Sequence, residues 1–265
     1  MLLRNKSAVI YGGGGAIGGA VARVFAREGA TVFIAGRTQS RLDAVAADIA
    51  AAGGKAETAQ VDAFDEQQVE RHADAVAAKV GGIDIALNAV SVLHDQVTVL
   101  ADLSLAEFMR PIEGFLRTLF ITSKAVARHM GARRPGVILT LSEPGSRLTA
   151  AGLLGHAVSS AGKEVFSRVL AAELAPRNIR VICIRPHATT DGPAAGSYTK
   201  ELFAPMAAAD GVPVEQWIAR LAQGTLLKRL PTLADVAETA AFLASDRVGV
   251  MTGTVVNLTS GALVD

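Results

Sequence analysis

The chain has 265 residues, and its 26 Lys and Arg against 25 Asp and Glu give a formal net charge of +1. This balance argues against a nucleic-acid-binding protein, which would carry a basic excess. Half of the residues are hydrophobic and only 19% are charged, which excludes a disordered chain and allows a large core.

The remaining composition bears on location. The one cysteine, Cys183, excludes an intramolecular disulfide and suits a reducing cytoplasm. The first residues lack a long apolar stretch, so no secretory signal is expected, and no apolar run is long enough to span a membrane. We therefore expect a cytoplasmic protein with neither a membrane nor a nucleic-acid partner.

Short β-branched runs alternate with longer helical patterns along the chain. Strands are predicted at residues 7–11, 31–35, 55–61, 83–88, 137–141, 180–184 and 255–258. Helices are predicted at residues 16–28, 40–52, 66–80, 105–130, 157–175 and 234–244. This alternation predicts an α/β fold: a single Rossmann-type, doubly wound domain over residues 1–265 with a seven-stranded, mainly parallel sheet.

One segment departs from this pattern. Residues 186–214 are rich in Pro, Gly, Ala and Ser and show weak periodicity. A long irregular stretch inside a compact domain is usually a binding loop or lid, so we expect a substrate loop here.

A glycine-rich turn lies between the first predicted strand and helix. Its glycines would let the backbone approach a pyrophosphate, and the helix N-terminus would offer free N–H groups to the phosphate charge. A plain tight turn is the alternative, but the position after the first strand favours dinucleotide binding. The residues expected to contact the cofactor are Gly12, Gly14, Gly15, Ala16, Ile17 and Gly18.

The end of the second predicted strand indicates which dinucleotide. An acidic residue there would hydrogen-bond the adenosine ribose, whereas this chain has Gly36 followed by Arg37. A guanidinium can pair with a 2′-phosphate, which favours NADP(H) over NAD(H). The alternative is that Arg37 is an ordinary solvated side chain.

These features resemble the short-chain dehydrogenase/reductase family over nearly the whole chain. Gly12, Ala16 and Gly18 stand at the glycine positions of that family's Thr-Gly-x-x-x-Gly-x-Gly loop, with Tyr11 in place of Thr. The resemblance also extends to residues 170–181, 229–235 and 251–261. It implies hydride transfer between NAD(P)(H) and an alcohol or carbonyl, with Asp62, Asn88 and Pro186 at further cofactor-binding positions.

The family's catalytic Tyr, Lys, Ser and Asn are not matched. An ungapped register from residues 165–174 places His156 at the Tyr position and Ser160 at the Lys position. Glu143 then stands at the Ser position, with Ser142 beside it, and Phe115 stands at the Asn position. The Ser position is retained only if the loop shifts by one residue.

Lys163 offers a different register, with Ser159 replacing the Tyr. That register requires three deleted residues in a packed helix, which would turn every preceding side chain by about 60°. We therefore expect Lys163 to be an ordinary helix residue that points away from the cleft, while His156 faces it.

Two readings of the changed site remain open. Glu143 and His156 would face each other, and an imidazole beside a carboxylate is a competent acid–base group for carbonyl reduction. Alternatively, both are loop or helix-start residues without a catalytic role. His72, His94 and His129 lack metal-ligand spacing and are interpreted as ordinary residues, so no metal is expected.

Two functional hypotheses follow. The first is an NADP(H)-dependent oxidoreductase acting on a small-molecule carbonyl or alcohol with a nonstandard proton donor. The second is a catalytically inactive homologue that binds a dinucleotide or acts as a structural or regulatory partner. The resemblance also implies a homo-oligomer, a dimer or tetramer that pairs the two long helices predicted at 105–130 and 157–175.

Overall fold

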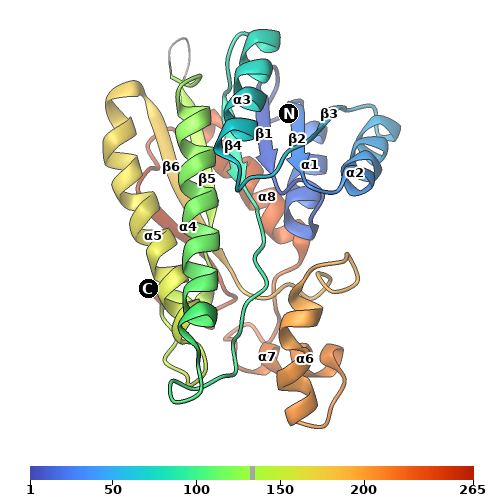
Figure 1. Cartoon of the computed structure of the whole chain (residues 1–265). Coiled ribbons are helices and arrows are strands. Elements are labelled where there is room, and N and C mark those ends of the chain that lie inside the picture. Colours follow the sequence, from blue (N-terminus) through green and yellow to red (C-terminus); the bar gives the residue numbers. More distant parts are fainter. Residues whose placement is uncertain (132–134) are drawn as a thin grey trace.

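The computed structural model describes residues 1–131 and 135–265. Its centre is a seven-stranded sheet in the order β3-β2-β1-β4-β5-β6-β7 (Figure 1), and all six pairings are parallel. The strands are β1 (Ser7–Tyr11), β2 (Thr31–Gly36), β3 (Lys55–Gln60), β4 (Ile85–Asn88), β5 (Gly136–Leu141), β6 (Ile179–Pro186) and β7 (Thr254–Leu258). The predicted doubly wound sheet is confirmed.

Helices cover both faces of this sheet (Figure 1). One layer contains α1 (Ala16–Arg27), α2 (Gln39–Ala51) and α8 (Leu233–Ala244). The other contains α3 (Glu66–Val80), α4 (Leu105–Ala127) and α5 (Leu154–Leu174). None of the helices in the described residues is both long and apolar enough to cross a membrane.

The strand sequences follow from this burial on both sides. In β1, Ala8 and Ile10 pack into the core beneath α1, α2 and α8, whereas Val9 and Tyr11 pack beneath α3, α4 and α5. Successive strand side chains point to opposite faces, so a doubly covered strand must be apolar at every position.

Local signals set the helix ends. The Asp65 side chain accepts a hydrogen bond from the backbone N–H of Gln68 at the start of α3, and Gly81 ends that helix with φ +78°. The left-handed conformation is cheap only for glycine, which explains why the helix stops there.

The segment expected to be irregular contains a helix. Residues 186–214 include α6 (Thr199–Ala209), and α7 (Val214–Gln223), which the sequence did not predict, follows at once. Leu202 and Phe203 of α6 pack with Ile218 of α7 in a small separate apolar cluster. Proline inside a helix is unfavourable, so Pro205 made a helix at this position hard to predict. The packing of α6 against α7 stabilises the helix despite this proline.

Candidate active site

A cavity of about 930 Å³ opens at the carboxyl ends of β1, β4, β5 and β6. Gly12, Asn88, Ser142 and Pro186, which lie at or just after these ends, all line it. The chain leaves β1 and β4 toward opposite faces of the sheet, and ligands of open α/β sheets bind at such a switch point.

Close backbone packing shapes the glycine-rich loop at one end of this cavity. Gly12 has φ +80°, and a Cβ there would overlap the carbonyl of Ala89. A Cβ on Gly18 would in turn overlap the carbonyl of Gly12. Gly18 was expected to contact the cofactor, but it is buried behind the loop and absent from the cavity wall. Glycine is therefore required at position 18 for steric reasons.

The remaining residues of the loop do face the cavity. Gly12, Gly14, Gly15, Ala16 and Ile17 line its wall. Gly15 is the N-cap residue of α1, and no side chain caps this helix end. The first N–H groups of α1 therefore lack a side-chain acceptor, which fits a pyrophosphate.

Basic side chains lie at the end of the cavity where the sequence predicts the adenosine of a dinucleotide. Arg37 and Arg41 are exposed and line the cavity after β2. Arg41, four residues further on, was not singled out from the sequence. Two guanidinium groups at one cavity wall suit a phosphate monoester.

Asp62, Asn88 and Pro186 line the same cavity, as expected. The Asn88 amide donates to Thr122 Oγ1 at 2.9 Å, and its oxygen accepts from the N–H of Val90 at 3.1 Å. Asn88 thus fixes the turn after β4 against α4.

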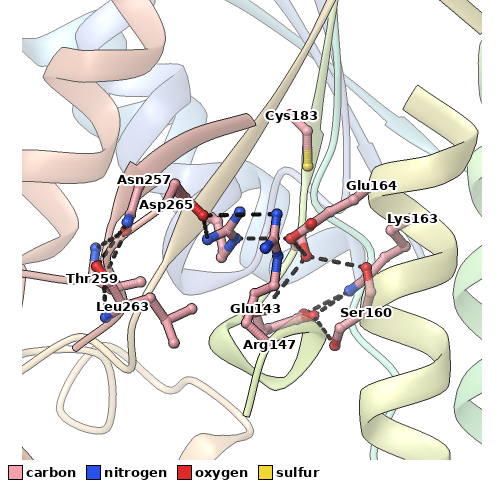
Figure 2. A network of polar contacts seen from close by, with 12 residues as sticks. Glu143, Arg147, Ser160, Lys163, Glu164, Cys183, Asn257, Thr259, Leu263 and Asp265 are labelled. Carbon is pink, nitrogen blue, oxygen red and sulfur yellow. Dashed lines mark hydrogen bonds and ion pairs between the residues drawn. The ribbon is translucent and has the colours of Figure 1, made fainter. Parts of the chain in front are cut away.

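A partly buried ion pair occupies the far end of the cavity (Figure 2). Lys163 Nζ lies 2.7 and 2.5 Å from the two carboxylate oxygens of Glu143. Ser160 Oγ donates to the same carboxylate at 3.0 Å, and Lys163 Nζ is 4.0 Å from the centre of the Phe115 ring. Burial alone would raise the pKa of Glu143, but Lys163, His156 and the hydrogen bonds from Lys163 and Ser160 hold it below its usual value.

The expectation that Lys163 points away from the cleft is therefore wrong. Lys163 lines the cavity, although its side chain is only 4% exposed. Seven helical residues turn to within about 20° of two full turns, so Lys163 shares a helix face with His156. Ser159 is fully buried and donates to the carbonyl of His156, and it is absent from the cavity wall.

His156 lines the cavity at the start of α5, and two residues of the segment after β4 hold its ring. His156 Nδ1 lies 3.0 Å from His94 Nε2 and 2.9 Å from the amide nitrogen of Gln96. The two imidazoles are stacked, with centroids 5.2 Å apart. Burial lowers the pKa of His156 to about 4, so the ring is neutral at pH 7.

Glu143 and His156 have different hydrogen-bond partners in the structure. Glu143 acts on His156 through its charge, while the carboxylate oxygens are bound by Lys163 and Ser160. The contacts that orient the imidazole come instead from His94 and Gln96. Ser160, expected at a catalytic position, is fully buried, and its hydroxyl donates a hydrogen bond to the Glu143 carboxylate.

Ser142 belongs to a polar network that includes Glu164 and Asp265, both labelled in Figure 2. The Ser142 hydroxyl donates to Glu164 at 3.0 Å, and Glu164 accepts from the Arg185 guanidinium at 2.8 Å. Arg185, only 1% exposed, also donates to Asp265 at 2.8 Å. Although Ser142 lines the cavity, its hydroxyl is committed to this network, which ties α5 and β6 to the C-terminal residue.

An apolar wall closes the cavity beyond the polar groups. It is formed by Leu148, Leu153, Tyr198, Leu202, Phe203, Met206, Trp217 and Leu221. No side-chain hydrogen bond involves the Tyr198 hydroxyl in the described part of the chain, and burial raises the pKa of that hydroxyl.

Across residues 1–131 and 135–265, no cluster of three or more His, Cys, Asp or Glu is placed to hold a metal ion.

Besides Arg41, sequence reasoning missed four site residues: His94, Gln96, Tyr198 and Lys163. Only Lys163 carried a usable signal, its heptad spacing from His156. The other three lie in segments without periodicity, and long-range packing brings them to the site.

Comparison with known proteins accords with this geometry. The family model described as enoyl-(acyl carrier protein) reductase matches residues 14–262. A 3-oxoacyl-[acyl-carrier-protein] reductase of Chlamydia muridarum is 31% identical over 262 residues, covering 98% of each chain. The 7alpha-hydroxysteroid dehydrogenase of Escherichia coli K12 is 28% identical over 98% of this chain and 95% of its own.

Solved structures agree with the sequence matches. A short-chain type dehydrogenase/reductase from Mycobacterium marinum has a TM-score of 0.83 at 27% identity, covering 99% of this chain and 97% of its own. A 7 alpha-hydroxysteroid dehydrogenase complexed with NADH and 7-oxo glycochenodeoxycholic acid has a TM-score of 0.86 at 27% identity, covering 99% and 96%. On its sequence and its fold, this chain belongs to the short-chain dehydrogenase/reductase family of oxidoreductases.

Proposed function

We propose that this chain transfers a hydride between NADP(H) and the carbonyl or alcohol group of an uncharged, mainly apolar small molecule. One observation carries the proposal: a single cavity joins the glycine-rich loop and Arg37 to Glu143, His156 and Lys163. A dinucleotide site and an acid–base group thus share one enclosed space, as hydride transfer requires.

The cofactor assignment rests on the chain's own donors. The free N–H groups at the start of α1 and the turn at Gly12 suit the pyrophosphate. Arg37 and Arg41 suit a 2′-phosphate, which distinguishes NADP(H) from NAD(H). When bound, the dinucleotide supplies the hydride donor or acceptor.

His156 is proposed to exchange the proton with the substrate oxygen. The ring lines the cavity and is neutral at pH 7, because burial lowers its pKa to about 4. Lys163 and Glu143 neutralise each other beside it, so that end of the site carries no net charge from the pair. An uncharged substrate group is therefore favoured there.

The apolar wall supports the substrate class and the lid. Leu202, Phe203 and Met206 of α6 and Trp217 of α7 line the cavity. We propose that residues 186–214 form the substrate lid of a single dinucleotide-binding domain spanning residues 1–265. Cys183 is fully buried, and burial raises its pKa to about 11, so its thiol stays protonated. We propose a cytoplasmic location because this cysteine has no second cysteine to pair with in the chain.

One observation favours a non-catalytic dinucleotide-binding protein instead. In the ungapped register Ser160 stands at the position of the family's ribose-holding Lys, and Lys163, which does line the cavity, is bound by both oxygens of Glu143. A binder without turnover would retain NADPH affinity and reduce no carbonyl.

Oxidation of NADPH with a panel of aliphatic, steroidal and aromatic ketones and aldehydes separates the two functions. We expect turnover by the wild type and none above background in His156→Ala. His129→Ala is the matched control, because His129 pairs with Asp74 outside the cavity. Equal rates in both variants, or an inactive wild type, would contradict the proposed reaction.

A further inference from the structure

His94 lies directly behind His156 and is as deeply buried. The relative exposures of His94, His156 and Gln96 are 6%, 7% and 9%. Three of their nitrogens form a triangle: His94 Nε2 to His156 Nδ1 is 3.0 Å, and the Gln96 amide nitrogen is 2.9 Å from His156 Nδ1 and 3.1 Å from His94 Nε2. Three buried nitrogens this close require an ordered set of protons.

One of these protons has a fixed place. His94 Nδ1 lies 2.7 Å from the carbonyl oxygen of Val92, which can only accept, so Nδ1 carries a hydrogen. His94 Nε2 is then either a bare acceptor or, in the imidazolium, a second donor. When His94 Nε2 is bare, it accepts a hydrogen bond from a protonated His156 Nδ1. When His94 Nε2 carries a hydrogen, it donates that hydrogen to a bare His156 Nδ1.

We propose that His94 and His156 form a proton relay in which His94 reloads His156 during the reaction. As His156 Nε2 gives its proton to the substrate oxygen, His156 Nδ1 takes the Nε2 proton of the His94 imidazolium. One N–H bond breaks and one forms on His156, which stays neutral and changes tautomer, while His94 becomes neutral. In alcohol oxidation the same steps run in reverse. This relay rests on the proposed function.

Gln96 fits both states of such a pair. Before transfer, the bare nitrogen is His156 Nδ1, 2.9 Å from the amide nitrogen; afterwards it is His94 Nε2, at 3.1 Å. The amide can therefore donate to whichever nitrogen lacks a hydrogen. A group that supports both tautomers lowers the cost of switching between them.

The surroundings allow one shared positive charge. Glu143 favours the imidazolium on both rings and Asp95 favours it on His94, whereas Lys163 and burial oppose it. The ring of Phe115 packs edge-on against the ring of His94, with the two centroids 5.7 Å apart, and it adds no charge. On balance the pKa of each ring is lowered, so the pair takes up its one shared proton below neutral pH.

The test uses full-length protein with ¹⁵N-labelled histidine, with and without NADP⁺, and compares the wild type with His94→Gln. The Gln side chain can still donate a hydrogen bond toward His156 but cannot pass on a proton. In the wild type, we expect the ring nitrogens of both histidines to titrate together in one coupled step. In His94→Gln, His156 should titrate alone. Independent titration in the wild type would overturn the relay whatever the activity.

Kinetics supply the second readout. We expect His94→Gln to lower kcat for carbonyl reduction by about 100-fold, within the usual range for acid–base catalysis, with little change in KM for NADPH. If His94 only positions the ring of His156, His94→Gln should retain the wild-type kcat, and this result would contradict the relay. If the wild type shows no turnover but its histidines titrate together, the shared proton stands and the proposed function fails.

Discussion

At the scale of single residues, Gly145 determines where the imidazole of His156 lies. A Cβ on Gly145 would overlap Cδ2 and Nε2 of His156. The edge of the ring that faces Gly145 is the one that carries the proposed reacting nitrogen, so this glycine is needed for space.

We therefore expect Gly145→Ala to displace the His156 ring and reduce kcat by at least tenfold, since misplacement of a catalytic group by about 1 Å costs this much or more. Thermal unfolding should change little, because the rest of the loop is unaltered. Steady-state kinetics with a calorimetric Tm measure both. An active Gly145→Ala enzyme would show that His156 is not the reacting group.

Arg37 carries the second prediction at this scale. Two charge-assisted hydrogen bonds to a 2′-phosphate, weakened by solvent exposure, give an expected preference of about tenfold for NADPH over NADH. Titration calorimetry should show this preference in the wild type and lose it in Arg37→Ala. Arg71→Ala, an exposed arginine outside the cavity, is the control. A preference that survives Arg37→Ala would assign the discrimination to Arg41 or elsewhere.

At the scale of elements, α4 and α5 present an unpaired apolar stripe. Val158, Val165 and Val169 of α5 are 43%, 46% and 50% exposed, and Phe120 of α4 is 52% exposed. Of the small α5 residues, Ala172 is exposed, whereas Gly162 packs against Leu116 and Ala171 is buried near Gly253. The stripe is thus mainly valine, with few small residues on it.

We expect this stripe to pair two copies of the chain around a two-fold axis. Light scattering at micromolar concentration should give at least a dimer mass, and Val165→Arg combined with Val169→Arg should give a monomer. Ala51→Arg, on exposed α2 in the other layer, should leave the mass unchanged. A monomeric wild type would contradict the pairing.

Periodicity predicted most elements of the fold. The bounds of β1 and α3 agree with the predicted ranges, and those of α1, α2 and α8 differ by a residue or so. The structure differs where the pattern is weakest, because α6 and α7 are stabilised by their mutual packing rather than by a long amphipathic face. Likewise, neither His94 nor Gln96 could be predicted, since only the path of the chain after β4 brings them to α5.

At the scale of the whole molecule, four histidines with a lowered pKa make stability depend on pH. Burial lowers the pKa of His72 and His156 to about 4, against 6.5 in the unfolded chain, and it also lowers the pKa of His94 and His187. Between these values, the unfolded state binds a proton that the folded state does not. Stability is therefore complete above about pH 6.5 and falls as the pH drops toward 4.

We expect His72 and His156 each to contribute a loss of about 1.4 kcal/mol per pH unit through that window, and His94 and His187 to add to the loss. Urea unfolding from pH 4.5 to 7.5 measures the total slope. His72→Gln should make it shallower, because it removes one of these groups. A free energy of unfolding that stays flat or rises as the pH falls would show that the rings are protonated in the folded state.

The central claim is hydride transfer beside His156, and the fate of a deuterium label tests it most directly. NADPH deuterated on the transferred position of the nicotinamide is incubated with the enzyme and a reducible apolar ketone, and the alcohol is analysed by mass spectrometry. The account predicts one deuterium on the carbinol carbon with the wild type and none above background with His156→Ala. Tight binding of NADPH without transfer of the label to any ketone tested would contradict it and identify the chain as a dinucleotide-binding protein without this activity.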